Sequence, residues 1–152
     1  MPVKLMKKAK AERINVKGES RMNIHKTYEL AFPIEHVYAA WVSSNTVIPP
    51  ATSMDILPEI GGHYRLFIEM PDMKSSNEGK FLIIEPNRHI RYTWEWNNDG
   101  NVTEIDVVFI PIQQGTRIVL KHSGFTDQQS MAMHDAGWDS YVEGFTNYLA
   151  DV

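Results

Sequence analysis

The clearest pattern along this chain is a stripe of large side chains in its last quarter. Positions on the stripe are separated alternately by three and four residues: Met131, His134, Trp138, Tyr141, Phe145 and Tyr148. Because residues at these spacings share one face of an α-helix, the stripe predicts a single long helix from Asp127 to Ala150. Thr126, with Gln129 three residues later, resembles a capping box at its start.

The opposite face of this predicted helix carries acidic residues. Asp135, Asp139 and Glu143 follow one another at a spacing of four, which is typical of a solvated surface. We therefore expect Trp138→Ala to cost about 3–5 kcal/mol of stability, the range for deleting a large buried aromatic side chain. Asp139→Ala should cost less than about 0.5 kcal/mol, as substitutions at solvated positions usually do.

Apolar and polar residues alternate over most of the chain between positions 63 and 125, which predicts antiparallel strands. The segments with this pattern are HYRLFIEM, GKFLIIE, RHIRYTWEW, TEIDVVFI and TRIVLKHSGF. An earlier strand over 22–30 leads through Pro33 into a short helix, IEHVYAAWV, and the segments SSNTVIPPATS and PDMKSSNE predict loops. The pattern thus predicts an α+β fold, in which a curved antiparallel sheet packs against the long C-terminal helix. Such an arrangement can enclose a pocket.

Length and composition place the chain in a simple class. A sequence of 152 residues, 43% of them hydrophobic, fits one globular domain. It contains no cysteine, and its lysine-rich beginning lacks the apolar core of a secretory signal. The longest apolar run is only a few residues, too short for a transmembrane helix. The sequence therefore predicts a cytoplasmic protein without a membrane span.

Charge divides the chain into two parts. Residues 1–21 hold seven lysines and arginines against two glutamates, a net charge of +5, which leaves −9 for the remainder of a chain whose total is −4. We expect 1–21 to be a flexible basic arm, or a short helix lying on an acidic body, and 22–152 to be the single domain. Phosphate contact by the arm is the less favoured alternative, so nucleic acid is not an expected partner.

Several motifs, in the same order along the chain, resemble one known family. They are VYAAW in the short helix, the Gly-Gly before Tyr64, EGKFLIIEPNRHIRYTWEW, HSGF at 122–125, and HDAGWDSYVEGFTNYL in the long helix. Over about residues 22–151 the chain resembles the activator of Hsp90 ATPase homologues, which belong to the START-like, or SRPBCC, superfamily. The resemblance implies a helix-grip fold and contact with a chaperone. Ile48, Pro49 and Pro50 stand where the family usually has a tryptophan and a proline, beside the expected cavity mouth.

Motifs for metal binding or catalysis are missing from the sequence. The six histidines show no HExxH or similar ligand spacing, and no GxSxG, P-loop or dinucleotide-binding turn occurs. We therefore expect no metal, no cofactor and no assigned catalytic residue. His122 and His134 share faces with apolar residues, so each is either a core histidine with a hydrogen-bond partner or a donor of a hydrogen bond or proton in a pocket.

Aromatic residues of the strands and of the long helix are the candidate lining of that pocket. The complete set of candidates is Tyr64, Tyr92, Trp94, Phe109, His122, His134, Trp138, Tyr141 and Phe145. Gly137 and Gly144 interrupt the helix although each costs about 1 kcal/mol relative to alanine, which indicates close packing or room for a ligand.

These observations favour a binding protein for a small hydrophobic or amphipathic molecule. Two alternatives stay open: a chaperone-associated regulator, and an enzyme of the cyclase or dehydratase kind that uses cavity histidines. The ligand's identity, the existence of a reaction and the formation of a homodimer are left undecided by the sequence.

Overall fold

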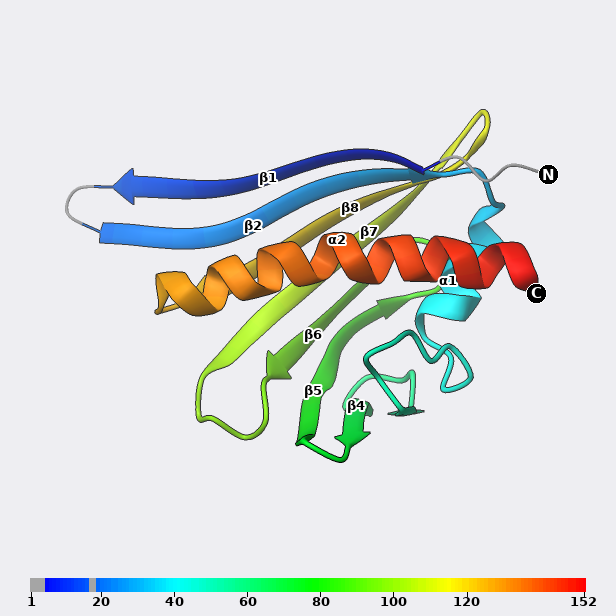
Figure 1. Ribbon diagram of the computed structural model, residues 1–152. Helices are drawn as coiled ribbons and strands as arrows, with labels where there is room; N and C mark the ends of the chain where they lie inside the picture. Colours follow the sequence, from blue (N-terminus) through cyan, green and yellow to red (C-terminus); the bar gives the residue numbers. More distant parts are fainter. Residues whose placement is uncertain (1–4, 17–18) are drawn as a thin grey trace.

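The computed structural model describes the backbone of residues 5–16 and 19–152, and the side chains of residues 23–152. Its strands form one eight-stranded antiparallel sheet in the order β1-β2-β8-β7-β6-β5-β4-β3 (Figure 1). The strands are β1 Leu5–Val16, β2 Glu19–Leu30, β3 Ser53–Ile56, β4 His63–Met70, β5 Met73–Glu85, β6 His89–Glu95, β7 Val102–Ile112 and β8 Gly115–Phe125. This curved sheet with a long C-terminal helix is the helix-grip arrangement that the sequence predicts.

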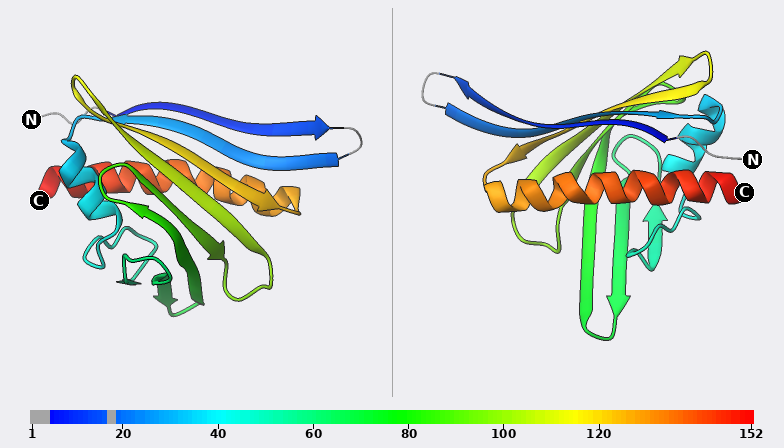
Figure 2. Two further views of the ribbon diagram at one scale, coloured as in Figure 1. Left: turned by 180° about the vertical axis from the view of Figure 1, so that it is seen from behind. Right: turned by 45° about the horizontal axis from the view of Figure 1, so that its top comes forward.

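Two helices pack against the sheet. α2, Gln128–Asp151, runs across its concave face, and α1, Ile34–Trp41, lies near the C-terminal end of α2 (Figure 2). The predicted start of α2 is wrong by one residue, because the N-cap is Asp127 and not Thr126. The Asp127 carboxylate accepts a hydrogen bond from the backbone N–H of Gln129 at 3.1 Å.

Three strand segments differ from the sequence pattern. β1 and β3 were not predicted, and β2 begins at Glu19 instead of Met22. β1 and the first residues of β2 lie in the segment that we expected to be a flexible arm, whose side chains fall outside the described residues. The domain boundary at residue 22 stays a prediction.

The expected loop PDMKSSNE is instead a tight hairpin, since β5 already begins at Met73 and pairs with Met70. The sequence of this part of β5 shows no alternation of apolar and polar residues, because its inward positions are polar: Ser75 and Asn77 are both buried. The Asn77 amide donates to the Leu66 carbonyl oxygen at 3.3 Å and to the Ser75 hydroxyl at 3.1 Å. These bonds satisfy polar groups that would otherwise be costly to bury.

The buried face of α2 is close to the predicted stripe, but it is turned slightly. Met131 and Phe145 are buried as expected, whereas His134, Trp138, Tyr141 and Tyr148 are half-buried. The remaining buried positions are Val142, Thr146 and Leu149. The large aromatic side chains in the middle of α2 therefore lie at the border of the packed core.

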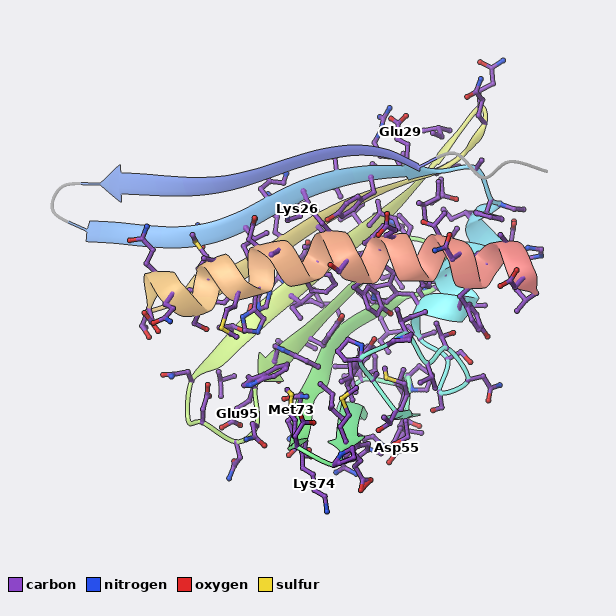
Figure 3. All side chains as sticks on the ribbon, viewed as in Figure 1. Lys26, Glu29, Asp55, Met73, Lys74 and Glu95 are labelled. Atoms are coloured by element: carbon purple, nitrogen blue, oxygen red, sulfur yellow. The ribbon has the colours of Figure 1, made fainter. Side chains whose placement is uncertain are left out.

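The acidic line of α2 is not a fully solvated face, so that prediction is wrong for two of its three residues. Lys26 of β2, only 1% exposed, lies against α2 (Figure 3). Its ammonium group is 3.1 Å from Asp135 and 3.0 Å from Asp139. The Tyr28 hydroxyl also donates to Asp139, at 2.8 Å. Buried charges require such partners, and these contacts fasten α2 to β2. Glu143 is exposed, as expected.

The two helix glycines have different roles. A Cβ atom at Gly144 would approach the Ile48 side chain to 2.5 Å, so this glycine allows close packing of the 46–51 segment on α2. A Cβ atom at Gly137 would meet nothing within 4 Å. Gly137 is exposed and leaves open space on the α2 surface.

Candidate binding pocket

A pocket of about 380 Å³ lies between the middle of α2, the strands β4, β6 and β7, and the segment 48–51. Buried side chains form its floor: Tyr64, Ile68, Tyr92, Trp94 and Ile105. Exposed residues form its rim: Pro49, Pro50, Met133, Gly137 and Ser140. The remaining lining residues are Ile48, Ala51, Leu66, Trp96, His134, Trp138 and Tyr141. The volume lies within the usual range of small-molecule sites, roughly 300–1,000 Å³.

Three tyrosines contribute phenol hydroxyl groups to the pocket. The rings of Tyr64 and Tyr92 are stacked, with centroids 4.7 Å apart and planes at 13°. Burial raises the pKa of Tyr64 and of Tyr92, and the hydroxyls of Tyr64 and Tyr141 lie near enough to influence each other's pKa. The buried Tyr141 hydroxyl has no hydrogen-bond partner of standard geometry among the described residues. These phenols remain protonated at neutral pH, so they can act as donors.

Trp138 joins the pocket to the core. One face of its indole is stacked on Trp41 of α1, with centroids 6.1 Å apart and planes at 11°. Its Nε1–H donates to Nδ1 of His122 at 3.0 Å. Packing against a buried tryptophan and a buried histidine fixes the indole, so this part of the pocket wall is preorganised.

His122 is a core histidine and does not line the pocket. It is 0% exposed, and its Nδ1 must be the unprotonated nitrogen because it accepts from Trp138. The other nitrogen, Nε2, therefore carries the hydrogen and donates to the Thr103 hydroxyl at 2.7 Å, which donates in turn to the Trp94 carbonyl oxygen at 3.1 Å. Every polar atom of the imidazole is thus used by the protein itself.

The burial of His122 predicts a pH dependence of stability. Burial, together with the charge of nearby His134, holds the pKa of His122 well below its ordinary value of 6.5. Below pH 6.5 the unfolded chain binds a proton that the folded chain does not, so the free energy of unfolding should fall with falling pH by up to about 1.4 kcal/mol per unit. Below the lowered pKa of His122, and again above pH 6.5, the contribution of this histidine to the free energy of unfolding no longer changes with pH.

Urea unfolding of wild type and His122→Gln between pH 7.5 and 5 measures this contribution. The variant should lose less stability on acidification than the wild type. His36→Gln, which replaces an exposed histidine, is the control and should keep the wild-type slope. Equal slopes for wild type and His122→Gln would contradict the assignment.

His134 lies at the pocket wall and is half-buried. Its Nδ1 is 2.9 Å from the Ser130 carbonyl oxygen, and because a carbonyl can only accept, Nδ1 carries a hydrogen. In the neutral ring Nε2 is then an acceptor. Among the described residues, the structure gives His134 no hydrogen bond to a second titratable side chain.

Six of the nine residues predicted from the sequence line this pocket: Tyr64, Tyr92, Trp94, His134, Trp138 and Tyr141. Phe109, His122 and Phe145 do not. Phe109 packs edge to face on Tyr38 at 5.3 Å, and Phe145 on Trp41 at 5.2 Å, because α1 covers that end of the sheet. His122 is covered by Trp138.

Sequence reasoning placed Ile48, Pro49 and Pro50 beside the mouth, where the pocket lining includes them, but it missed part of the rim and the aliphatic floor. Leu66 and Ile68 share a strand face with Tyr64, and Ile105 shares one with Phe109, so these three could have been found from that parity. Met133 and Ser140 lie beside the α2 stripe and gave no such signal.

Two other kinds of feature are absent from the described part of the chain. Those residues contain no cluster of three or more histidines and carboxylates that could hold a metal ion. They also contain no helix long and apolar enough to cross a membrane.

Comparisons with known proteins agree with the fold. A family model described as "Activator of Hsp90 ATPase homolog 1-like protein" matches residues 31–150. No curated protein matches the chain. Among solved structures, the chain is similar to an AHSA1-like protein from Aeromonas hydrophila, with 19% identity, a TM-score of 0.72, and coverage of 86% of this chain and 93% of that one.

Two further solved structures resemble this chain with similar sequence identity, TM-score and coverage. An HSP90 activator from Plasmodium falciparum shares 18% identity and a TM-score of 0.72, over 85% of this chain and 96% of that one. A protein from Chromobacterium violaceum shares 19% identity and a TM-score of 0.73, over 84% and 96%. Because the sequence identities are this low, these similarities show a shared fold alone.

Proposed function

Since this chain belongs to the Activator of Hsp90 ATPase homolog 1-like protein family, with the START-like helix-grip fold, we propose that it binds a small hydrophobic or amphipathic molecule in the pocket under α2. The observation that carries the proposal is the pocket itself, which has a buried aromatic floor and an exposed rim. A pocket bounded by apolar walls with a few polar groups is the usual form of a small-molecule site. We propose that the six predicted residues named above line the ligand site, together with the other residues of the floor and rim.

Gly137 supports this proposal. Glycine is unfavourable by about 1 kcal/mol in a helix interior, yet here no neighbouring atom would obstruct a side chain. Steric packing therefore does not explain the glycine. An open approach to the pocket rim does, because a larger residue at this position would occupy the rim.

Native mass spectrometry of freshly purified protein, followed by organic extraction, tests the proposal. We expect a species heavier than the polypeptide, with an extractable organic molecule. Gly137→Trp should lose that species, because the indole would fill the mouth, while the helix itself should tolerate the change. Ala136→Trp, at an exposed neighbouring position outside the pocket, is the matched control and should retain it. Retention of the bound molecule by Gly137→Trp would contradict the proposed site.

Catalysis is not proposed. Of the two candidate histidines, His122 is enclosed by Trp138 and Thr103, and among the described residues His134 has no hydrogen bond to a second titratable side chain that could orient it. Chaperone contact, cytoplasmic location and homodimer formation remain predictions. No surface feature of the described residues specifically favours the chaperone role over the pocket.

A further inference from the structure

Among the described residues that line the pocket there is no lysine, arginine, aspartate or glutamate. The titratable members of this described lining are His134 and the tyrosines Tyr64, Tyr92 and Tyr141. A ligand carboxylate, phosphate or ammonium group would therefore leave water without meeting a fixed opposite charge, which is strongly unfavourable. This lining disfavours a ligand whose ionised group would reach the buried floor, and favours an uncharged molecule there.

The lining carries several hydrogen-bond donors, among them the hydroxyls of Tyr64, Tyr92, Tyr141 and Ser140, and within the described part of the chain one of these donors is buried without a partner. The Tyr141 hydroxyl is buried and, although the Tyr64 hydroxyl lies near it, it has no partner of standard geometry among the described residues. Burial raises the pKa of Tyr141 to about 12, so the hydroxyl keeps its proton at neutral pH. A buried donor without a partner costs free energy, and an acceptor oxygen on the ligand would remove that cost.

Flat surfaces dominate the floor and one wall. Tyr64 is stacked on Tyr92 and meets Trp94 edge to face, with centroids 6.0 Å apart and planes at 73°. On the α2 side, Trp138 is held flat against Trp41 and meets Tyr141 edge to face at 5.9 Å. Rings fixed in this way present faces and edges for stacked or edge-to-face contacts with another ring system.

We propose that the pocket takes an uncharged, planar aromatic molecule whose carbonyl-type oxygen accepts a hydrogen bond from the Tyr141 hydroxyl. This inference rests on the proposed function and narrows the class of ligand. A carbonyl fits because it accepts without donating, and the pocket offers Tyr141 as the partner. The aromatic ring system supplies the apolar contact area.

Three matched naphthalenes serve as probes, with quenching of the pocket tryptophans and calorimetry as readouts. 2-Acetylnaphthalene is the neutral acceptor, 2-naphthoate is its anionic counterpart, and 2-isopropenylnaphthalene replaces the carbonyl oxygen by CH₂. We expect wild type to bind the ketone at least about tenfold more tightly than the anion and several-fold more tightly than the hydrocarbon, the range that one hydrogen bond provides.

Tyr141→Phe isolates the hydrogen bond. Ketone affinity should fall by about tenfold, while hydrocarbon affinity should change by less than about twofold, because only an oxygen atom is removed. Tyr148→Phe, on the same helix but outside the pocket lining, is the control and should bind all three probes as wild type does.

The outcomes separate this inference from the proposed function. Naphthoate binding as tightly as the ketone, or an equal loss for ketone and hydrocarbon in Tyr141→Phe, would overturn the inference while leaving a binding pocket. Binding of none of the three probes would overturn this inference, and the native mass spectrometry described above then decides the proposed function separately. If Tyr141→Phe does not fold, the order of the three affinities in wild type decides.

Discussion

Trp138→Ala is expected to lower the free energy of unfolding by about 3–5 kcal/mol, a large part of a typical domain's stability. The change removes the stack on Trp41 and the edge-to-face contact with Tyr141. It also deprives the buried Nδ1 of His122 of its donor, which adds the cost of an unsatisfied polar atom. Urea or guanidinium denaturation measures the loss.

Glu143→Ala is the matched control for this substitution. Glu143 lies on the same helix, five residues further on, but its side chain is exposed. Its removal should change stability by less than about 0.5 kcal/mol. Similar losses for Trp138→Ala and Glu143→Ala would mean that α2 packs on the sheet through a different face.

Asp139→Ala is expected to lower the free energy of unfolding by about 2–4 kcal/mol, which reverses the expectation from sequence alone. The substitution removes one of the two carboxylates that neutralise Lys26, and the acceptor of the Tyr28 hydroxyl. The loss of a hydrogen bond to a charged group, together with the loss of one carboxylate partner from a buried ammonium group, has a cost of this magnitude. Asp135 still contacts Lys26, which limits the loss.

A double-mutant cycle with Lys26→Met tests this explanation. In the Lys26→Met background no buried ammonium needs a partner, so Asp139→Ala should cost much less there than in wild type. The difference between the two costs is the coupling energy. A coupling near zero would show that Asp139 stabilises α2 independently of Lys26.

From β2 onward, apart from the short β3, the order of elements could be predicted, because apolar periodicity follows from burial on one face. The pattern failed where inward positions are polar. Lys26 lies on the same strand face as Ile24 and Tyr28, so the sequence did signal a buried lysine. Its partners could not be identified, because Asp135 and Asp139 are distant in sequence and are brought to it only by the packing of α2 on β2.

The candidate pocket was predictable to a similar extent. Alternation places Tyr64, Tyr92 and Trp94 on the inner sheet face, and the helix stripe points Trp138 and Tyr141 toward them. Periodicity does not specify which inward residues face space and which face another side chain. That distinction depends on α1, which covers Phe109 and Phe145, whereas Trp138 and Tyr141 touch Trp41 of α1 and still keep part of their surface on the pocket.

Methyl-detected NMR of the protein with bound 2-acetylnaphthalene tests the central claim most directly. Ile68 and Ile105 line the pocket floor, whereas Ile90 and Ile118 are equally buried elsewhere in the sheet. We predict intermolecular NOEs from the naphthalene protons to the methyl groups of Ile68 and Ile105, and none to those of Ile90 and Ile118. NOEs confined to exposed methyl groups such as those of Ile60 and Leu82, or none at saturating probe, would contradict a ligand site beneath α2.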